Sequence, residues 1–158
     1  MPRRRGRRRG AEREFSAGGV VVREAPDRPG SHECVVIVPS RRAANGSRVL
    51  ALPKGHPDGD ETADEAALRE VLEETGVRAR VVERLGDVRY WYQRDGRRII
   101  KVVTFFLLEH QSGDPERHED EEIDEARWMD LAEAGRALTH TGEREMTALA
   151  LSRLASGR

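Results

Sequence analysis

The chain contains a single cysteine, Cys34, so it cannot form a disulfide within itself. This residue lies in the apolar run ECVVIV, where we expect a small buried side chain. No hydrophobic run approaches the roughly 18 residues of a membrane-spanning helix, so we expect no membrane partner and a cytoplasmic location. The five histidines lack the spacing of a zinc site, which favours a hard cation with oxygen ligands over a transition metal.

Lysine is almost absent from the chain. Of the 28 basic residues, only Lys54 and Lys101 are lysines. A lysine ammonium is a compact point charge that can neutralise a phosphate without the fork geometry of arginine. In a sequence that otherwise uses arginine, both lysines are therefore candidates for contact with a phosphorylated substrate.

Charge is distributed unevenly along the chain. The first ten residues, MPRRRGRRRG, carry six arginines and no acid, so that with a net charge of −1 overall the remaining residues carry −7. This segment lacks the apolar region of a secretory signal, and we expect residues 1–12 to be a disordered arginine-rich tail. Contact with nucleic acid or another acidic surface is the alternative role for this tail. No other part of the chain is a candidate for contact with nucleic acid. Residues 13–158 have the length of one domain.

The order of predicted elements indicates an α/β fold. Strands are expected at EFSAGGVVVRE, HECVVIVPS, SRVLALP, ARVVERLGDVRYWY, RRIIKVVTFFLLEH and ARWMD, and helices at residues 63–75, LAEAGRAL and GEREMTALALSRL. The residues RDG supply a turn between the two longest strands. In the last helix, the apolar residues that recur at helical spacing are expected to pack in the core, namely Met146, Leu149, Ala150 and Leu154.

The most informative segment is GHPDGDETADEAALREVLEETGV, at residues 55–77. Thr62 and Glu65 have the spacing of a capping box, in which each side chain accepts a hydrogen bond from the other residue's main chain. Gly76 stands where a left-handed cap would end the helix. The segment therefore predicts a helix over residues 63–75.

Three carboxylates of this helix share one face. Glu70, Glu73 and Glu74 fall within about 100° of arc at 3.6 residues per turn. Like charges at this spacing repel one another, and a bound divalent cation would reverse the sign of that interaction. The spacing therefore predicts a metal site, and an amphipathic helix with a merely solvated charged face is the alternative.

The same segment resembles the Nudix box, whose pattern is glycine, five residues, glutamate, seven residues, arginine-glutamate, a bulky aliphatic, any residue, two glutamates, any residue, glycine and a bulky aliphatic. Every fixed position is matched, by Gly55, Glu61, Arg69, Glu70, Val71, Glu73, Glu74, Gly76 and Val77. The resemblance covers about residues 13–155. It implies a Nudix-type α/β/α sandwich with a mixed sheet.

The resemblance also implies a chemistry. Nudix enzymes hydrolyse a pyrophosphate bond in nucleoside diphosphate derivatives, with Mg²⁺ (or Mn²⁺) as cofactor and water attacking phosphorus. The implied metal ligands are Glu70, Glu73, Glu74, Glu122 and a backbone carbonyl at the turn of Lys54 and Gly55. The implied catalytic carboxylates are Glu70, Glu73 and Glu122, and either of the last two is a candidate general base. Glu61 and Arg69 match positions that support the loop and helix through an ion pair.

Glu122 is the implied ligand that lies outside the box, in the acidic loop before Trp128. It stands six residues before Trp128, a spacing that resembles the loop from which several Nudix hydrolases present an additional carboxylate. Asp120, Glu121 and Glu125 compete for this role, and a solvated acidic loop is the alternative.

The runs LPKGHPDGDET and GRRIIKVVTFFL, with the aromatic cluster between them, most resemble bacterial diadenosine polyphosphate hydrolases. By this resemblance, aromatic rings would stack on adenine and basic side chains would meet the phosphates. The implied substrate-binding residues are Lys54, Tyr90, Tyr92, Arg97, Arg98 and Lys101. The departure is that both tyrosines lie closer to the box than the tyrosine typical of that class.

Two further functions stay open. One is a housecleaning pyrophosphatase for oxidised nucleoside triphosphates or ADP-ribose. The other is a non-catalytic nucleotide sensor or nucleic-acid binder, which would not need three clustered acids.

Overall fold

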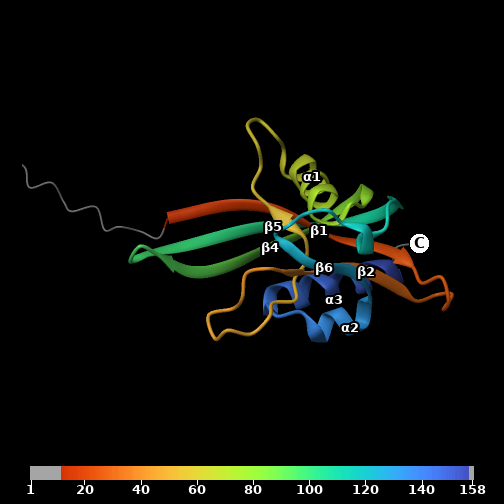
Figure 1. The fold of residues 1–158 in the computed structure, drawn as a ribbon. Helices are drawn as coiled ribbons and strands as arrows, with labels where there is room; N and C mark the ends of the chain where they lie inside the picture. Colours follow the sequence, from red (N-terminus) through yellow and green to blue (C-terminus); the bar gives the residue numbers. More distant parts are fainter. Residues whose placement is uncertain (1–11, 157–158) are drawn as a thin grey trace, which may run out of the picture.

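A six-stranded mixed sheet forms the centre of the computed structural model, which describes residues 12–156 (Figure 1). The strands run in the order β4-β5-β1-β2-β6, and β3 pairs with β1 beside this path. Their bounds are β1 (Glu12–Glu24), β2 (His32–Pro39), β3 (Lys54–Gly55), β4 (Arg78–Arg94), β5 (Arg97–Ser112) and β6 (Ile123–Asp130). β1 and β5 are parallel, whereas the other paired strands are antiparallel.

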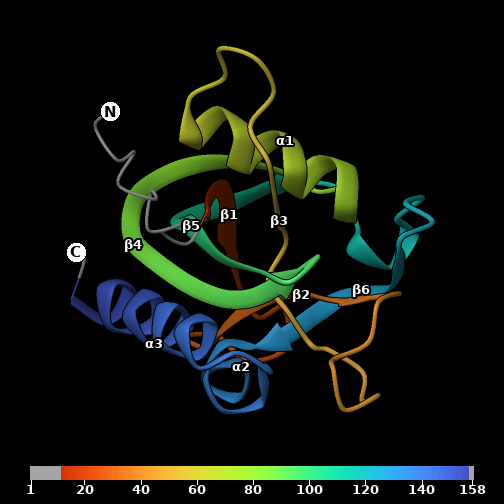
Figure 2. The same ribbon diagram turned by 90° about the vertical axis from the view of Figure 1, so that its left-hand side faces the viewer.

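Helices cover both faces of the sheet, as Figure 2 shows. Helix α1 (Ala63–Thr75) lies on one face, and α2 (Leu131–Ala137) and α3 (Thr141–Ser156) lie on the other; a short 3₁₀ helix, η1 (Pro115–Arg117), precedes β6. Side chains alternate along β1, so that Val20 and Val22 pack on the side of α2 and α3 while Ala17 and Val21 pack on the side of α1. The predicted α/β/α sandwich with a mixed sheet is confirmed.

Helix α1 begins and ends where the sequence predicts. The side chain of Thr62 accepts a hydrogen bond from the main chain of Glu65, and the reciprocal bond of the capping box is also present. Gly76 ends the helix with φ 72°, and its N–H donates to the carbonyl of Leu72. The buried face carries Ala66, Ala67, Val71 and Thr75. Glu70 and Glu74 lie at the border of this face and are partly buried, whereas Glu73 is exposed.

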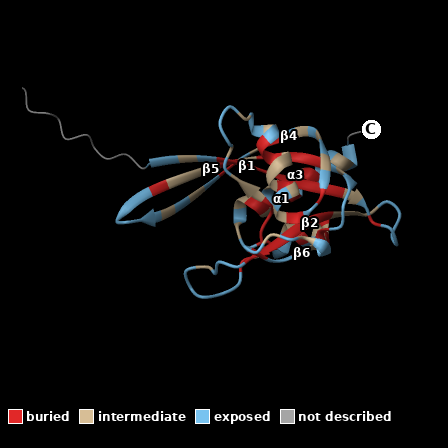
Figure 3. Cartoon of the chain, turned by 45° about the horizontal axis from the view of Figure 1, so that its top comes forward, coloured by how far each residue is buried: buried red, intermediate tan, exposed pale blue. Residues whose placement is uncertain are grey.

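The hairpin of β4 and β5 extends beyond the helices together with the start of β1 (Figures 1 and 3). Its turn consists of Asp95 and Gly96, between the paired residues Arg94 and Arg97, as the residues RDG predict. The far end of the hairpin is mostly exposed, with Ile99 as a buried exception.

The strand predicted at SRVLALP does not form, and this expectation is wrong. Only Ala51 in this segment makes a bridge to β2, with Ile37. The N–H groups of two neighbouring residues find partners outside any ladder: that of Leu50 donates to Thr139 Oγ1, and that of Leu52 to Glu143 Oε1. Side chains of the C-terminal helical region therefore satisfy the donors that a strand would have used.

The apolar residues predicted for the last helix lie in the core. Ala150 is buried, and Met146, Leu149 and Leu154 pack against the same cluster. Cys34 is also buried, and burial raises the pKa of its thiol to about 12.

The arginine-rich tail, at residues 1–11, lies outside the described residues, and Glu12 already belongs to β1. Across residues 12–156, no helix combines the length and the apolar character needed to cross a bilayer.

Candidate active site

A cleft of about 1270 Å³ brings most of the predicted site residues together. Its acidic wall contains Asp58, Glu70, Glu73, Glu74, Asp120 and Glu122. Its basic residues are Arg41, Lys54, Arg89, Arg94 and Lys101, and its aromatic residues are His56, Tyr90, Trp91, Tyr92 and His140. A cleft lined by both carboxylates and cations suits a ligand in which phosphate groups lie near a metal ion.

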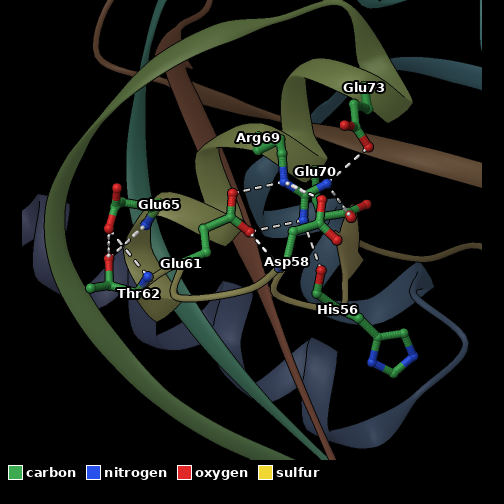
Figure 4. Close-up of polar contacts among 8 residues, drawn as sticks. All are labelled: His56, Asp58, Glu61, Thr62, Glu65, Arg69, Glu70 and Glu73. Carbon is green, nitrogen blue, oxygen red and sulfur yellow. Dashed lines mark hydrogen bonds and ion pairs between the residues drawn. The ribbon is translucent and has the colours of Figure 1, made fainter.

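Arg69 connects the loop before α1 to the glutamates of α1 (Figure 4). Its Nε lies 2.8 Å from Glu61 Oε2, and its Nη1 lies 2.8 Å from Glu70 Oε1 and 3.0 Å from Glu73 Oε2. Its Nη2 donates to the main-chain carbonyl of His56 at 2.7 Å. The hydrogen bond from Arg69 lowers the pKa of Glu61, so this carboxylate is ionised at neutral pH. The ion pair predicted between Glu61 and Arg69 is thus present, and it holds the loop against the helix.

Gly55 allows the carboxyl group of Glu70 to lie against the main chain. A Cβ atom at position 55 would overlap all three terminal atoms of the Glu70 side chain. Strand β3 holds Gly55 in register with Ala17 of β1. Burial raises the pKa of Glu70, whereas its ion pair with Arg69 acts in the opposite direction.

Glu74 is the most strongly perturbed of the three helix carboxylates. Its Oε1 accepts a hydrogen bond from the N–H of Lys54 at 2.8 Å. Burial raises the pKa of Glu74 to about 8, although this N–H and the charge of Lys54 oppose the shift. A carboxylate that is costly to ionise where it lies is a group whose charge a nearby cation would stabilise.

The donor set fits a hard divalent cation. Within residues 12–156, no three acidic, histidine or cysteine side chains converge closely enough to enclose an ion; Glu70 and Glu73 turn toward Arg69, and Glu74 turns toward Lys54. These carboxylates nevertheless line one cleft together with Gly55, whose missing side chain lets the Glu70 carboxyl group lie against the main chain. Mg²⁺ prefers such oxygen ligands and takes only a few carboxylates, with water and phosphate completing its shell.

The acidic loop before β6 contributes two carboxylates to the cleft. Asp120 and Glu122 line it, whereas their predicted competitors Glu121 and Glu125 do not. The N–H of Glu122 donates to Asp120 Oδ1 at 2.9 Å, and its carbonyl accepts from the N–H of Ser40 at 2.8 Å. These bonds fix the main chain of the loop and leave the Glu122 side chain exposed.

The two lysines face the cleft from neighbouring elements. Lys54 Nζ lies 3.1 Å from Glu143 Oε2, and only 7% of the Lys54 side chain is exposed. Lys101 is partly buried and has no ion pair among the described residues. Burial lowers its pKa, and the nearby charges of Lys54 and Arg41 lower it further. A partly buried cation beside other cations is well suited to receive an anion.

The hydroxyl groups of both cleft tyrosines donate to glutamate carboxylates. Tyr90 donates to Glu143 Oε2 at 2.6 Å, and Tyr92 donates to Glu14 Oε2 at 2.5 Å. Arg97 and Arg98, also predicted to bind substrate, do not line the cleft. Arg97 pairs with Glu12 at 2.8 Å, and the Arg98 guanidinium stacks on Trp91 at 4.1 Å from the ring centre.

The sequence did not single out several charged and histidine residues that line the cleft, namely Arg41, His56, Asp58, Arg89, Arg94 and His140. It also did not single out Glu143, which contacts Lys54 and Tyr90 of the lining. Helical spacing could have indicated Glu143, because it shares a buried face of α3 with Thr147 and Ala150. An unpaired glutamate on such a face would be unfavourable, so a partner could have been expected. Arg41 and His140 lie in connecting segments that carry no periodic pattern.

The family model described as the NUDIX domain matches residues 10–150. The chain belongs to the Nudix family. Among curated Nudix relatives, the putative mutator protein MutT4 of Mycobacterium tuberculosis is 36% identical over 149 residues, which are 94% of this chain and 59% of that protein. The asymmetrical bis(5'-nucleosyl)-tetraphosphatase of Rattus norvegicus is 36% identical over 59% of this chain and 63% of that protein. This Nudix chain therefore spans less than two thirds of the length of either relative.

Solved Nudix structures share the fold. The Caenorhabditis elegans Ap4A hydrolase in a binary complex superposes with a TM-score of 0.69 at 22% identity, over 92% of this chain and 99% of that one. The NUDIX domain of Shewanella oneidensis NrtR, complexed with ADP ribose, gives a TM-score of 0.67 at 18% identity, over 92% and 90%. At these identities the likeness establishes the architecture alone.

Proposed function

We propose that the chain is a Nudix hydrolase that cleaves a pyrophosphate bond in a nucleoside diphosphate derivative with Mg²⁺ or Mn²⁺, and that dinucleoside polyphosphates such as diadenosine polyphosphates are its substrates. The observation that carries this proposal is the position of Glu70, Glu73 and Glu74 on one face of α1, where they line the same cleft as Lys54 and Lys101. Carboxylates can hold the cation and lysines can hold the phosphates, so both requirements of the reaction meet in one cavity.

Each residue has a distinct task in this reaction. Glu70, Glu73, Glu74 and a main-chain carbonyl at Lys54 or Gly55 hold the cation, which when bound acidifies a coordinated water and offsets phosphate charge. Arg69 and Glu61 hold the helix glutamates and the loop in place, through the contacts described above.

Glu122 is the proposed general base, with Glu73 as the other candidate. Glu122 has no ion pair among the described residues, whereas Glu73 accepts a hydrogen bond from Arg69 at 3.0 Å. The exposed Glu122 carboxylate has both oxygens available to a water in the cleft, whereas Arg69 occupies one oxygen of Glu73.

The size and charge of the cleft support a dinucleoside polyphosphate. Its volume of about 1270 Å³ exceeds the usual range of about 300–1,000 Å³ for small-molecule pockets. Arg41, Lys54, Arg89, Arg94 and Lys101 provide cations for a chain of several phosphates, and the aromatic residues provide faces for a base. The names of the rat tetraphosphatase and the nematode Ap4A hydrolase are consistent with this choice.

A housecleaning pyrophosphatase is the second candidate. It is favoured by the name of the MutT4 relative, a putative mutator protein, and by the mouse ADP-sugar pyrophosphatase, which is 41% identical over 43% of this chain and 31% of that protein. Such an enzyme would act on oxidised nucleoside triphosphates or ADP-ribose, which fill less of the cleft.

Product analysis separates the two candidates. The chain is incubated with Mg²⁺ and either diadenosine polyphosphates, ADP-ribose, or normal and oxidised nucleoside triphosphates, and the products are resolved by chromatography. We expect the highest kcat/KM for a diadenosine polyphosphate, with two unequal nucleotides as products. The matched control is Glu73→Gln, since this side chain is 55% exposed and its replacement should not disturb folding. Preference for ADP-ribose or an oxidised triphosphate would select the second candidate, and equal rates for wild type and Glu73→Gln would reject both.

A further inference from the structure

Glu143 is the only charged residue that is fully buried within residues 12–156. It lies in the first turn of α3, and its exposed fraction is 0%. Neither the Nudix box nor the cleft lining includes it. Burying a carboxylate is costly unless every oxygen is compensated, so its contacts should account for its presence.

Three donors compensate the two oxygens of Glu143. Oε1 accepts from the N–H of Leu52 at 2.6 Å, and Oε2 accepts from Lys54 Nζ at 3.1 Å and from the hydroxyl of Tyr90 at 2.6 Å. Burial alone would raise the pKa of Glu143, but Lys54, the Leu52 N–H and Tyr90 together hold it below its ordinary value. The side chain is therefore ionised at neutral pH.

These contacts tie residues 52–55 between two helices. Lys54 is held at both ends, because its N–H donates to Glu74 of α1 and its ammonium pairs with Glu143 of α3. The next residue is Gly55, whose main chain lies against Glu70. A shift of α3 or loss of its carboxylate would thus be transmitted to the segment that faces the box glutamates.

Stability alone is a poor explanation for this arrangement. Replacing a buried ion pair by apolar side chains of similar size is often neutral or stabilising, whereas removing one partner is costly. A fixed direction for the Lys54 ammonium and for the main chain before Gly55 is something that apolar packing would not supply.

We propose that Glu143 is a positioning residue, which holds Lys54 and the main chain at residues 52–55 in the geometry that the cleft requires. The proposal rests on the proposed hydrolytic function for its kinetic consequence. Its structural consequence is independent of that function: Lys54 should lose its fixed environment when the Glu143 carboxylate is removed.

The kinetic test compares Glu143→Gln with Thr147→Val. The single amide oxygen of glutamine can still accept from the N–H of Leu52, while its NH2 group can donate to the hydroxyl oxygen of Tyr90. Glutamine no longer carries the charge that fixes Lys54. Because a misplacement of about 1 Å can cost about 100-fold in rate, we expect kcat to fall at least 30-fold while KM changes less than threefold. Thr147 is equally buried on α3, but its hydroxyl bonds only to the carbonyls of Glu143 and Arg144, so the valine variant should keep wild-type kcat and KM.

A double-mutant comparison adds a readout that general destabilisation would not reproduce. Lys54→Met should lower kcat, and the Glu143→Gln/Lys54→Met double variant should be within threefold of Lys54→Met alone, since the two residues act as one unit. Multiplied losses in the double variant would overturn the proposal.

The scarcity of lysine offers a readout that needs no activity. Labelling with ¹³C-lysine gives side-chain signals from Lys54 and Lys101 only, and Lys101→Arg assigns them. Glu143→Gln should move the Lys54 signal to the position of a solvated lysine, whereas Thr147→Val should leave it in place. If Glu143→Gln does not fold, Glu143→Asp replaces it, since the shorter carboxylate cannot reach Leu52 and Lys54 together and should also move the signal.

The outcomes separate the two proposals. An unmoved Lys54 signal in the Glu143 variants overturns the positioning role, whatever the activity. A wild-type chain that hydrolyses none of the nucleotides, but whose Lys54 signal responds as expected, supports the positioning of Lys54 and rejects the proposed function. A moved signal with unchanged kcat overturns the claim that this geometry matters for turnover.

Discussion

Substitution of Gly55 by alanine adds one methyl group at the point where the loop before α1 touches Glu70 of that helix. The added Cβ would overlap the carboxyl group of Glu70, and this group must withdraw by on the order of 1 Å to reach an ordinary van der Waals separation. The main chain itself accepts alanine, because Gly55 is not among the residues with positive φ. The perturbation is therefore confined to the position of one proposed metal ligand.

Its expected effect is large on turnover and small on stability. A displacement of about 1 Å in a catalytic site can cost about 100-fold, which corresponds to about 2.7 kcal/mol of transition-state stabilisation. The end of a flexible glutamate can move aside cheaply, so the free energy of unfolding should change by less than about 1 kcal/mol.

The assay is steady-state hydrolysis of a diadenosine polyphosphate, combined with thermal unfolding of the same samples. Gly135→Ala is the matched control: this glycine lies within α2, and its added Cβ would meet the nearest atom, Thr147 Oγ1, at 3.6 Å. We expect wild-type kcat and a gain of about 0.5–1 kcal/mol in stability for this control. Wild-type kcat in Gly55→Ala would refute the role assigned to Glu70 beside Gly55.

Three further substitutions test other parts of the site. Arg69→Gln should lower kcat at least 100-fold and lower Tm, because it removes the ion pairs to Glu61, Glu70 and Glu73. A kcat near that of the wild type would show that these ion pairs are dispensable. Lys101→Met should raise KM about tenfold with little change in kcat, and an unchanged KM would remove Lys101 from the binding site. The same substitution should raise Tm, because burial and neighbouring cations disfavour the charge of Lys101. Because the pKa of Glu143 in the folded chain is below the ordinary 4.5, its contribution to stability is complete above pH 4.5 and is lost as pH falls through the lower value. Denaturant unfolding between pH 3 and 7 should therefore show a shallower acid limb in Glu143→Gln, and an identical slope would contradict the assignment.

Local signals allowed α1 and the box to be predicted from the sequence. The capping box, Gly76 and the helical spacing of the glutamates all act within residues 55–77, so no distant contact was needed to define them. The ion pair of Glu61 and Arg69 joins residues of this same segment.

Contacts between distant segments account for what the sequence did not reveal. The strand expected at SRVLALP is absent because its N–H groups bond to Thr139 and Glu143, about 90 residues further along the chain. Arg97 was predicted at the cleft from the resemblance of its run to diadenosine polyphosphate hydrolases, but its pairing with Glu12 follows from the parallel contact of β1 and β5. Neither contact leaves a signature in the neighbouring sequence.

Titration with Mn²⁺ tests most directly whether Glu70, Glu73 and Glu74 form a cation site. Electron paramagnetic resonance measures free Mn²⁺ in the presence of a non-hydrolysable nucleotide, for the wild type, Glu74→Gln and the control Thr147→Val. We expect the wild type and the control to bind Mn²⁺ alike, and Glu74→Gln to bind it at least tenfold more weakly. Equal affinity in all three chains, or no bound Mn²⁺ in the wild type, would contradict the site.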